Sequence, residues 1–182
     1  MFESATTFET PEGTCGLSWT DSGLTRVRPF EAGPLSAAGR LRRPDTRLIA
    51  EADAPLHIAA VIASLRAFLS GVSTGFHDVT LDMTGVPLFE AELYVALRAV
   101  RWGETISYAG LAGRIGLEPI AARAVGVAMG RNPWPLIVPC HRVLTSDGKV
   151  GGFSAPGGTR TKTALLAREG VHLDGGQLAL FE

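Results

Sequence analysis

Three consecutive residues, Cys140, His141 and Arg142, combine a potential nucleophile, a potential base and a cation. They follow an apolar run, residues 132–139, that contains three prolines. Because proline fixes φ and lacks a backbone donor, this run is expected to be a short extended segment rather than a helix. A cysteine reacts as its thiolate, which nearby cations or hydrogen-bond donors stabilise. The pattern therefore predicts chemistry at Cys140.

Cys140 also has a purely structural interpretation, because free cysteines are most often small buried hydrophobic residues. His141 is not automatically its partner, since adjacent residues on an extended strand point to opposite faces. Contact between them would need a turn at Pro139 or a bridging water. The second cysteine, Cys15, shares one face of a predicted strand with other apolar residues, and we expect it in the core.

The composition is that of a folded protein with a substantial core. Of 182 residues, 46% are hydrophobic and 19% are charged, which suits one compact domain or two small ones. The sequence contains no recognisable secretory signal and no apolar run of the roughly 18 residues that cross a membrane. Two cysteines far apart, without a CxxC pair or clustered histidines, argue against a disulfide framework or a metal site. We expect a cytoplasmic protein without a cofactor.

The formal net charge of −1 hides an asymmetry along the chain. Residues 98–169 contain ten arginine and lysine side chains and four acidic ones, which gives this segment a charge of +6 and the remainder −7. A basic segment around the candidate cysteine is typical of a protein that binds a polyanion. An ordinary solvated arginine-rich face is the alternative.

The first half is expected to form a small antiparallel sheet with one helix, after a loose polar lead-in at residues 1–13. Alternating runs at residues 15–20 and 24–30 predict a hairpin. Residues 31–47, rich in Gly, Pro and Arg without periodicity, predict a surface loop. Apolar residues at helical spacing predict a helix between Asp53 as cap and Gly71 as stop, and residues 79–83 predict another strand.

The second half is expected to be mostly helical. Periodic apolar residues predict a helix over residues 89–102. Ser107 is a predicted N-cap for a short helix that stops at Gly116, and a third helix is expected over residues 119–129. Two short helices with a tight glycine-containing turn are typical of a helix-turn-helix. A final helix is expected over residues 159–169.

The third helix carries one long polar side chain, Arg123, among alanines and glycine, so it would read base edges poorly. A helix of small residues could instead lie close to a phosphate backbone or in the narrow groove, with Arg123 inserted into the duplex. The alternative is a tightly packed interior helix with Arg123 at the surface. Beyond the cysteine, the glycine-rich residues 151–158 lack the GxxxxGK[ST] pattern of a phosphate loop. Backbone amides of such a loop suit the wall of a pocket for a planar ring.

A set of motifs in residues 85–170 resembles the O6-alkylguanine-DNA alkyltransferases, or methylated-DNA–protein-cysteine methyltransferases. The motifs are Ala122-Arg123-Ala124-Val125-Gly126, Asn132-Pro133, Pro139-Cys140-His141-Arg142-Val143, Gly151-Gly152-Phe153-Ser154, and Lys162 with Leu165, Leu166 and Glu169. The first 80 residues match this family only in the expected order of strands and helix. The resemblance implies an α+β fold with two domains. Residues 1–84 would be a ribonuclease H-like structural domain, and residues 85–182 a helix-turn-helix, winged-helix-like domain that binds DNA and accepts the alkyl group.

The resemblance also implies a single-turnover DNA repair reaction. Members of the family bind duplex DNA carrying O6-alkylguanine through a helix-turn-helix in the minor groove. They flip the damaged guanine out and transfer its alkyl group irreversibly to a cysteine. Flipping is required because the O6 atom lies inside the base stack. A monomer associated with the nucleoid is implied, and O4-alkylthymine is a second substrate that the resemblance leaves open.

Residue roles are carried over by position. Cys140 would be the alkyl acceptor and His141, through a water, the base that takes its proton. Glu169 would orient His141, and Asn132 would brace the cysteine loop. The implied DNA- and substrate-binding residues are Tyr108, Arg123, Ala124, Gly126, Arg142, Val143, Phe153, Ser154 and Lys162.

Within the binding set, Arg123 would fill the gap left by the flipped base, and Tyr108 would press on the adjacent phosphate. The carbonyls of Cys140 and Val143 and the amide of Ser154 would hold the guanine edges. Lys162 would support the leaving-group side.

Three departures from the family pattern bear on which alkyl groups fit. Phe153 replaces a tyrosine found in many members, Trp134 replaces a smaller apolar residue, and the pocket loop at residues 154–158 is two residues longer. A DNA-binding sensor that holds alkylguanine without repair is a competing hypothesis, but sensors of this kind replace the cysteine. A cysteine hydrolase is a third class, and no nucleophile-elbow motif supports it.

Overall fold

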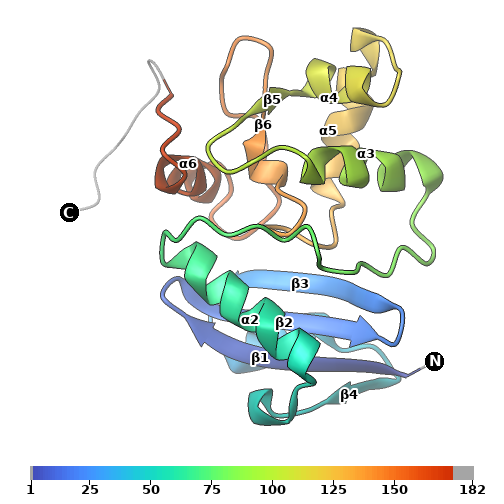
Figure 1. The fold of residues 1–182 in the computed structure, drawn as a ribbon, viewed down its shortest axis with the longest axis vertical. Coiled ribbons are helices and arrows are strands. Elements are labelled where there is room, and N and C mark those ends of the chain that lie inside the picture. Colours follow the sequence, from blue (N-terminus) through green and yellow to red (C-terminus); the bar gives the residue numbers. More distant parts are fainter. Residues whose placement is uncertain (1, 174–182) are drawn as a thin grey trace.

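A computed structural model describes residues 2–173 (Figure 1). The first half of the chain forms a mixed sheet with helices packed against it, and the second half is mostly helical. The sheet has the order β3-β2-β1-β4, in which β4 pairs parallel with β1 and the other neighbours are antiparallel. The elements of this half are β1 (Glu3–Thr10), β2 (Gly13–Thr20), β3 (Gly23–Glu31), α1 (Pro34–Leu41), β4 (Thr46–Leu48), η1 (Glu51–Asp53) and α2 (Leu56–Leu69).

Both faces of the sheet are covered, because successive residues of a strand point to opposite sides. Cys15 and Leu17 of β2 belong to the core that α2 completes, and Cys15 is fully buried, as expected. Gly16 points the other way, where a Cβ would lie 2.6 Å from Leu41 of α1. Glycine at this position therefore lets α1 pack directly on β2.

Several predictions for this half were wrong. Residues 3–10 form β1 instead of a loose lead-in, and residues 34–41 form α1 instead of a loop. The polar residues of β1 have partners inside the fold: the Glu3 carboxylate accepts hydrogen bonds from Thr25 at 2.5 Å and Thr46 at 2.9 Å. Residues 79–83 make only an isolated bridge, between Leu24 and Leu81. Pro55, and not Asp53, occupies the N-cap of α2.

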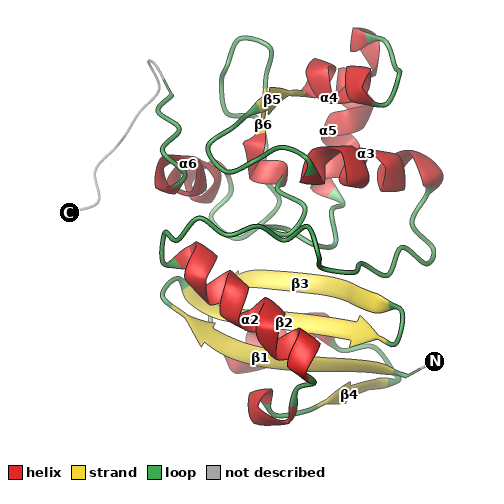
Figure 2. Ribbon diagram, in the orientation of Figure 1, coloured by secondary structure: helices red, strands yellow, loops and turns green. Residues whose placement is uncertain are grey.

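As far as residue 173, the second half contains the remaining helices and one two-stranded parallel sheet (Figure 2). Its elements are α3 (Leu88–Arg98), β5 (Ile106–Ser107), α4 (Tyr108–Arg114), η2 (Pro119–Ala121), α5 (Ala122–Gly130), η3 (Cys140–Arg142), β6 (Val143–Leu144) and α6 (Thr159–Arg168). None of the helices in residues 2–173 is both long and apolar enough to span a membrane.

The predicted order of helices in this half is confirmed, with changes at their ends. The Ser107 hydroxyl accepts a hydrogen bond from the Gly110 amide at 2.9 Å, so Ser107 is the N-cap of α4. The third helix begins with the separate 3-10 turn η2 before α5. Helix α3 ends at Arg98 instead of residue 102, and beyond it the Val100 carbonyl accepts a hydrogen bond from Arg142 at 2.6 Å. This long-range bond pairs a carbonyl that lies beyond the end of α3.

Strand β3 joins the sheet to the cysteine-containing half. The Val27 amide donates to the Pro133 carbonyl at 2.8 Å, and the Trp134 indole donates to the Leu24 carbonyl at 2.8 Å. These bonds cover an otherwise open sheet edge. The sheet therefore supports the segment that leads to Cys140.

Candidate active site

The segment before Cys140 is a tight turn, so the prediction of an extended segment was wrong. The Val138 amide donates to the Trp134 carbonyl at 2.8 Å, which closes a loop in which Leu136 has φ +77°. Pro139 then has φ −79° and ψ 65°, and the Cys140 amide donates back to Val138 at 2.8 Å. This is the geometry of an inverse γ-turn. A turn at Pro139, one of the two ways in which His141 could come close to Cys140, is therefore present. The 3-10 helix η3 follows it directly.

Asn132 holds this loop closed from inside. Its side-chain amide donates to the Val138 carbonyl at 2.8 Å, and its Oδ1 accepts from the Trp134 amide at 2.9 Å. Both ends of the turn are therefore bonded to one buried side chain. Trp134 is itself buried, 1% exposed, and faces Tyr94 and the sheet instead of the cysteine.

Cys140 lies at the floor of a cavity of about 460 Å³, which we call the cysteine cavity. Its wall is formed by the start of α4, the face of α5 and the glycine-rich loop. The lining residues are Tyr108, Ala122, Arg123, Gly126, Met129, Gly130, Cys140, Gly151, Gly152, Phe153 and Ser154. Cys140 is 4% exposed, whereas Arg123 at the rim is exposed.

Behind the cysteine, His141, Arg142 and Glu169 form a buried ion cluster. His141 Nε2 lies 2.8 Å from Glu169 Oε1, and Arg142 donates to both carboxylate oxygens, from Nε at 2.8 Å and from Nη2 at 2.9 Å. Residue 169 caps the C-terminus of α6, 27 residues beyond Arg142. The end of α6 thus positions a carboxylate against both residues that follow Cys140.

The ion cluster determines which nitrogen of His141 carries the proton. Burial alone would raise the pKa of Glu169, but hydrogen bonds from His141 and Arg142 lower it to about 2, so Glu169 is ionised. An ionised carboxylate only accepts hydrogen bonds, and therefore Nε2 is the donor. Burial lowers the pKa of His141 and keeps the ring neutral, against the raising effect of Glu169.

The other ring nitrogen, His141 Nδ1, is then an unprotonated acceptor. It is buried and, within residues 2–173, has no hydrogen-bond partner. Buried polar atoms without a partner are rare in folded proteins. This atom is consequently available to accept a proton.

Lys162 is a second buried cation close to the cysteine. Its Nζ donates to the Val143 carbonyl at 2.6 Å and lies 3.5 Å from the Tyr108 hydroxyl. Burial lowers the pKa of Lys162 to about 8. Burial also raises the pKa of the Cys140 thiol, while the Asn132 hydrogen bond and the Lys162 charge act in the opposite direction. At neutral pH Cys140 is a thiol, and its deprotonation requires a base.

Tyr108 is placed by two pieces of local structure. Strand β5 ends immediately before it and pairs with β6, which begins at Val143. The glycine-rich loop then crosses the tyrosine so closely that a Cβ at Gly151 would lie 2.7 Å from the phenol oxygen. Gly151 thus allows the loop to close the cavity over the ring. On the other edge of the ring, a Cβ added at Gly126 would make only ordinary van der Waals contact, at 3.8 Å.

The structure distributes the other expected residues around this centre. Phe153, Ser154 and Gly126 line the cysteine cavity, Ala124 is exposed on α5, and Val143 and Arg142 lie behind the cavity wall. Trp134 is not a lining residue, so the expectation that it affects which alkyl groups fit has no direct contact to support it.

Met129 and Gly151 also line the cavity. Met129 was not predicted, and Gly151 was predicted only as part of the glycine-rich motif and pocket wall, without a role of its own. A hydrophobic residue one turn beyond Gly126 was the available signal for Met129. No local signal identified Gly151 among the glycines of its loop.

Comparison with known proteins shows the family to which the chain belongs. Residues 88–171 match the model described as "6-O-methylguanine DNA methyltransferase, DNA binding domain". A methylated-DNA–protein-cysteine methyltransferase of Methanothermobacter thermautotrophicus is 32% identical over 88% of this chain and 81% of its own length. A Thermus thermophilus relative called a DNA base-flipping protein is 34% identical over 89% of this chain and 97% of its own length.

A solved structure gives the same result for the fold. The crystal structure of Mycobacterium tuberculosis OGT in complex with DNA is similar with a TM-score of 0.73 and 34% identity. The match covers 92% of this chain and 93% of that one. The likeness therefore extends over both halves of the chain.

Proposed function

Since the chain belongs to the methylated-DNA–protein-cysteine methyltransferase family, we propose that it repairs DNA by moving an alkyl group from the O6 atom of guanine to Cys140. The observation that carries this proposal is a cysteine at the floor of a cavity, backed by a neutral histidine whose free Nδ1 is buried. The transfer consumes the protein, because a thioether does not release its alkyl group under physiological conditions.

Each part of the reaction has a group to perform it. The Cys140 proton passes to His141 Nδ1, through a water, and Glu169 holds the ring so that Nε2 stays protonated. The thiolate then attacks the alkyl carbon in line, so that an S–C bond forms as the C–O6 bond breaks. The departing guanine takes up a proton from the donors at the other side of the cavity, Tyr108 and Lys162.

DNA reaches the cavity over helix α5. Arg123 at the rim is exposed and would occupy the space of the flipped guanine, while Ala124 and Gly126 let the helix lie close to the duplex. The flipped base enters between Tyr108 and the loop that carries Phe153 and Ser154. A base left in the stack would keep its O6 atom out of reach of the thiol.

The same proposal covers the domains, their topology, the oligomeric state, the location and the substrates. Residues 1–84 form the structural domain and residues 85–182 the DNA-binding and acceptor domain, joined by the bonds of β3. The first has ribonuclease H-like and the second winged-helix-like topology. The protein acts as a monomer on duplex DNA in the cytoplasm, and the cavity admits O6-alkylguanine and, as a second substrate, O4-alkylthymine.

Mass spectrometry provides the direct test. After incubation with duplex DNA containing O6-methylguanine, the tryptic peptide that contains Cys140 should gain the mass of one methyl group. The lesion should disappear in equal amount. An unmodified Cys140 peptide with the lesion persisting would exclude repair and favour a sensor.

The variant Cys140→Ala separates chemistry from DNA binding. It should bind the same duplex as tightly as the wild-type protein and leave the lesion in place. A folded variant that no longer binds DNA would contradict a purely chemical role for the thiol.

A further inference from the structure

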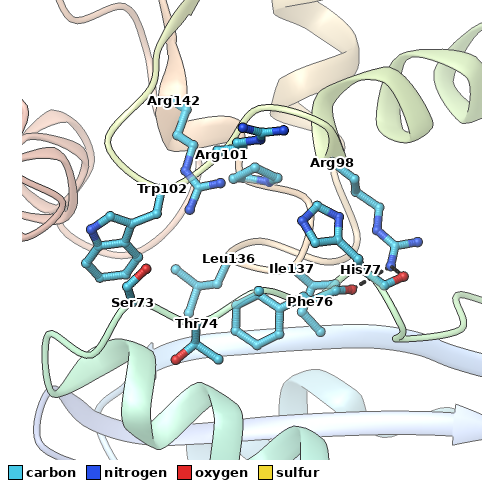
Figure 3. Close-up of a pocket in the computed structure, with 12 residues that line it drawn as sticks. Ser73, Thr74, Phe76, His77, Arg98, Arg101, Trp102, Leu136, Ile137 and Arg142 are labelled. Atoms are coloured by element: carbon cyan, nitrogen blue, oxygen red, sulfur yellow. Dashed lines mark hydrogen bonds between the residues drawn. The ribbon is translucent and has the colours of Figure 1, made fainter.

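A second cavity, of about 320 Å³, lies behind the cysteine loop, and we call it the rear pocket (Figure 3). Three segments meet there: the chain after α2, the end of α3 with the residues beyond it, and the cysteine loop. Its lining residues are Ser73, Thr74, Gly75, Phe76, His77, Arg98, Arg101, Trp102, Leu136, Ile137, Pro139 and Arg142. It shares no lining residue with the cysteine cavity, although Pro139 directly precedes Cys140.

The lining of the rear pocket is basic. It contains three arginines and one histidine and no carboxylate. Two of the arginines are already used: Arg142 is paired with Glu169, and Arg98 Nη2 donates to the carbonyls of residues 76, 77 and 79. The guanidinium of Arg101 is exposed and has no hydrogen bond or ion pair with any residue in 2–173. Two acids are bonded to the backbone of this segment: Glu104 accepts from the Arg101 amide at 3.0 Å, and Glu169 from the Gly103 amide at 3.3 Å.

The loop of residues 73–77 adds hydrogen-bond donors to this charge. None of its five backbone amides donates to another described residue, and neither does the Ser73 hydroxyl. The loop contributes the imidazole of His77, which is also exposed and unpaired among the described residues. Unpaired backbone amides next to a guanidinium that has no carboxylate partner are the groups that typically bind a tetrahedral oxyanion.

The floor of the pocket is backbone under strain. Leu136, which is buried, has φ +77°, a conformation that costs a leucine on the order of 1 kcal/mol. Strained residues concentrate at binding and active sites because the surrounding structure has to hold them. Leu136 lies between the hydrogen bonds that Asn132 makes to the cysteine loop and the lining of the rear pocket.

We propose that the rear pocket binds a phosphate group, held by Arg101, His77 and the free amides of residues 73–77. A guanidinium group can donate two parallel hydrogen bonds to two oxygens of one phosphate. The volume of the rear pocket lies at the lower end of the range for ligand pockets, about 300–1,000 Å³. A phosphate there touches segments from both halves of the chain. It therefore stabilises the folded protein around the cysteine loop without entering the cysteine cavity.

Inorganic phosphate is the probe for the first experiment, with the full-length protein at constant ionic strength set by sodium chloride. We expect saturable binding by calorimetry and a saturable rise in Tm. Arg101→Gln combined with His77→Gln should weaken binding at least tenfold and remove the Tm shift. Both side chains are exposed, so this variant keeps its fold. Arg47→Gln, an exposed arginine on β4, is the matched control and should bind as the wild-type protein does.

The source of the phosphate is distinguished by competition. If undamaged duplex DNA displaces inorganic phosphate, and the double variant binds DNA more weakly, the group is a phosphate of the DNA backbone. If DNA and phosphate bind independently, the ligand is a free phosphate or a phosphate ester. Absence of saturable phosphate binding, or equal binding by the double variant, would overturn the proposal. Methyl transfer to Cys140, measured in parallel by mass, tests the proposed function separately.

Discussion

The buried ion cluster behind Cys140 and the exposed face of α5 differ in how their charges are partnered. In the cluster, the Glu169 carboxylate accepts from His141 and Arg142 at 2.8–2.9 Å, and all three residues are buried. On α5, Arg123 is exposed and has no hydrogen bond or ion pair with any described residue. The charges of the cluster are paired within the protein, whereas the charge of Arg123 is free to pair with a bound molecule.

This difference matches two physical tasks. Proton transfer from a buried thiol needs fixed dipoles and charges in a region of low dielectric constant, where reorganisation would be costly. Insertion into DNA needs a side chain that loses little when it leaves water and gains phosphate or base contacts in exchange. Changes in the cluster should therefore affect stability and chemistry together, and changes on α5 should affect only reactions on DNA.

The largest effect should come from Glu169→Gln. Arg142 would then be a buried cation without a compensating charge. His141 would face an amide that can donate as well as accept, so its tautomer would no longer be fixed. We expect a loss of about 3 kcal/mol in the free energy of unfolding, measured by chemical denaturation. Alkyl transfer should slow by about 100-fold, measured as the single-turnover rate on methylated duplex.

Glu92→Gln is the control for that variant. Glu92 is exposed on α3, so the same chemical change should leave both quantities unaltered. Lower stability of Glu169→Gln with an unchanged transfer rate would contradict the role of Glu169 in orienting His141.

Acid should weaken the cluster in a defined pH range. The pKa of Glu169 is lowered in the folded protein to about 2, below its ordinary value of 4.5. The carboxylate therefore stabilises the folded state above pH 4.5, and this contribution is lost as the pH falls toward 2. Between about pH 6 and about pH 3, the free energy of unfolding of the wild-type protein should fall by about 2 kcal/mol more than that of Glu169→Gln. Parallel pH profiles of the two proteins would contradict this assignment.

Arg123→Ala tests the exposed side of the comparison. If Arg123 fills the gap left by the flipped base, as we propose, removing its side chain makes flipping less favourable, and transfer from duplex DNA should slow by about 10- to 100-fold. Transfer from free O6-benzylguanine, which needs no flipping, should change little, and stability should be unaffected. Arg114→Ala, an exposed arginine on α4, is the charge-matched control. Equal losses on duplex and free base would remove the flipping role.

Local signals in the sequence were sufficient for much of the second half. Ser107 marks a helix start, and its cap bond depends only on the Gly110 amide three residues away. The same holds for the hairpin of β2 and β3, whose turn residues lie between two alternating runs. Elements of this kind can be predicted because the contacts that define them are close in the chain.

The turn before Cys140 could not be predicted in this way. Leucine at position 136 gives no sign of a positive φ. The bonds that close the turn are local, but Trp134 at its start also donates to the Leu24 carbonyl, 110 residues earlier in the chain. Strand β1 was missed for a related reason, because the partners of Glu3 lie on β3 and β4. A polar residue can be buried in a strand if its hydrogen-bond partners are distant in the chain. From the sequence alone such a residue suggests a loop, because those partners are not known.

The smallest effect we predict is that of Phe153→Tyr at the rim of the cysteine cavity. Phe153 is half-buried there and lines the cavity. If the flipped guanine enters as we propose, we expect an added hydroxyl to donate a hydrogen bond to it. One such bond to a partly solvated base contributes about 0.5–1.5 kcal/mol. We therefore expect transfer from both duplex and free O6-benzylguanine to accelerate by about two- to 13-fold, with Phe2→Tyr, at an exposed position, as control. An unchanged rate would mean that Tyr108 and Lys162 already complete proton delivery to the guanine and that Phe153 serves only as an apolar wall.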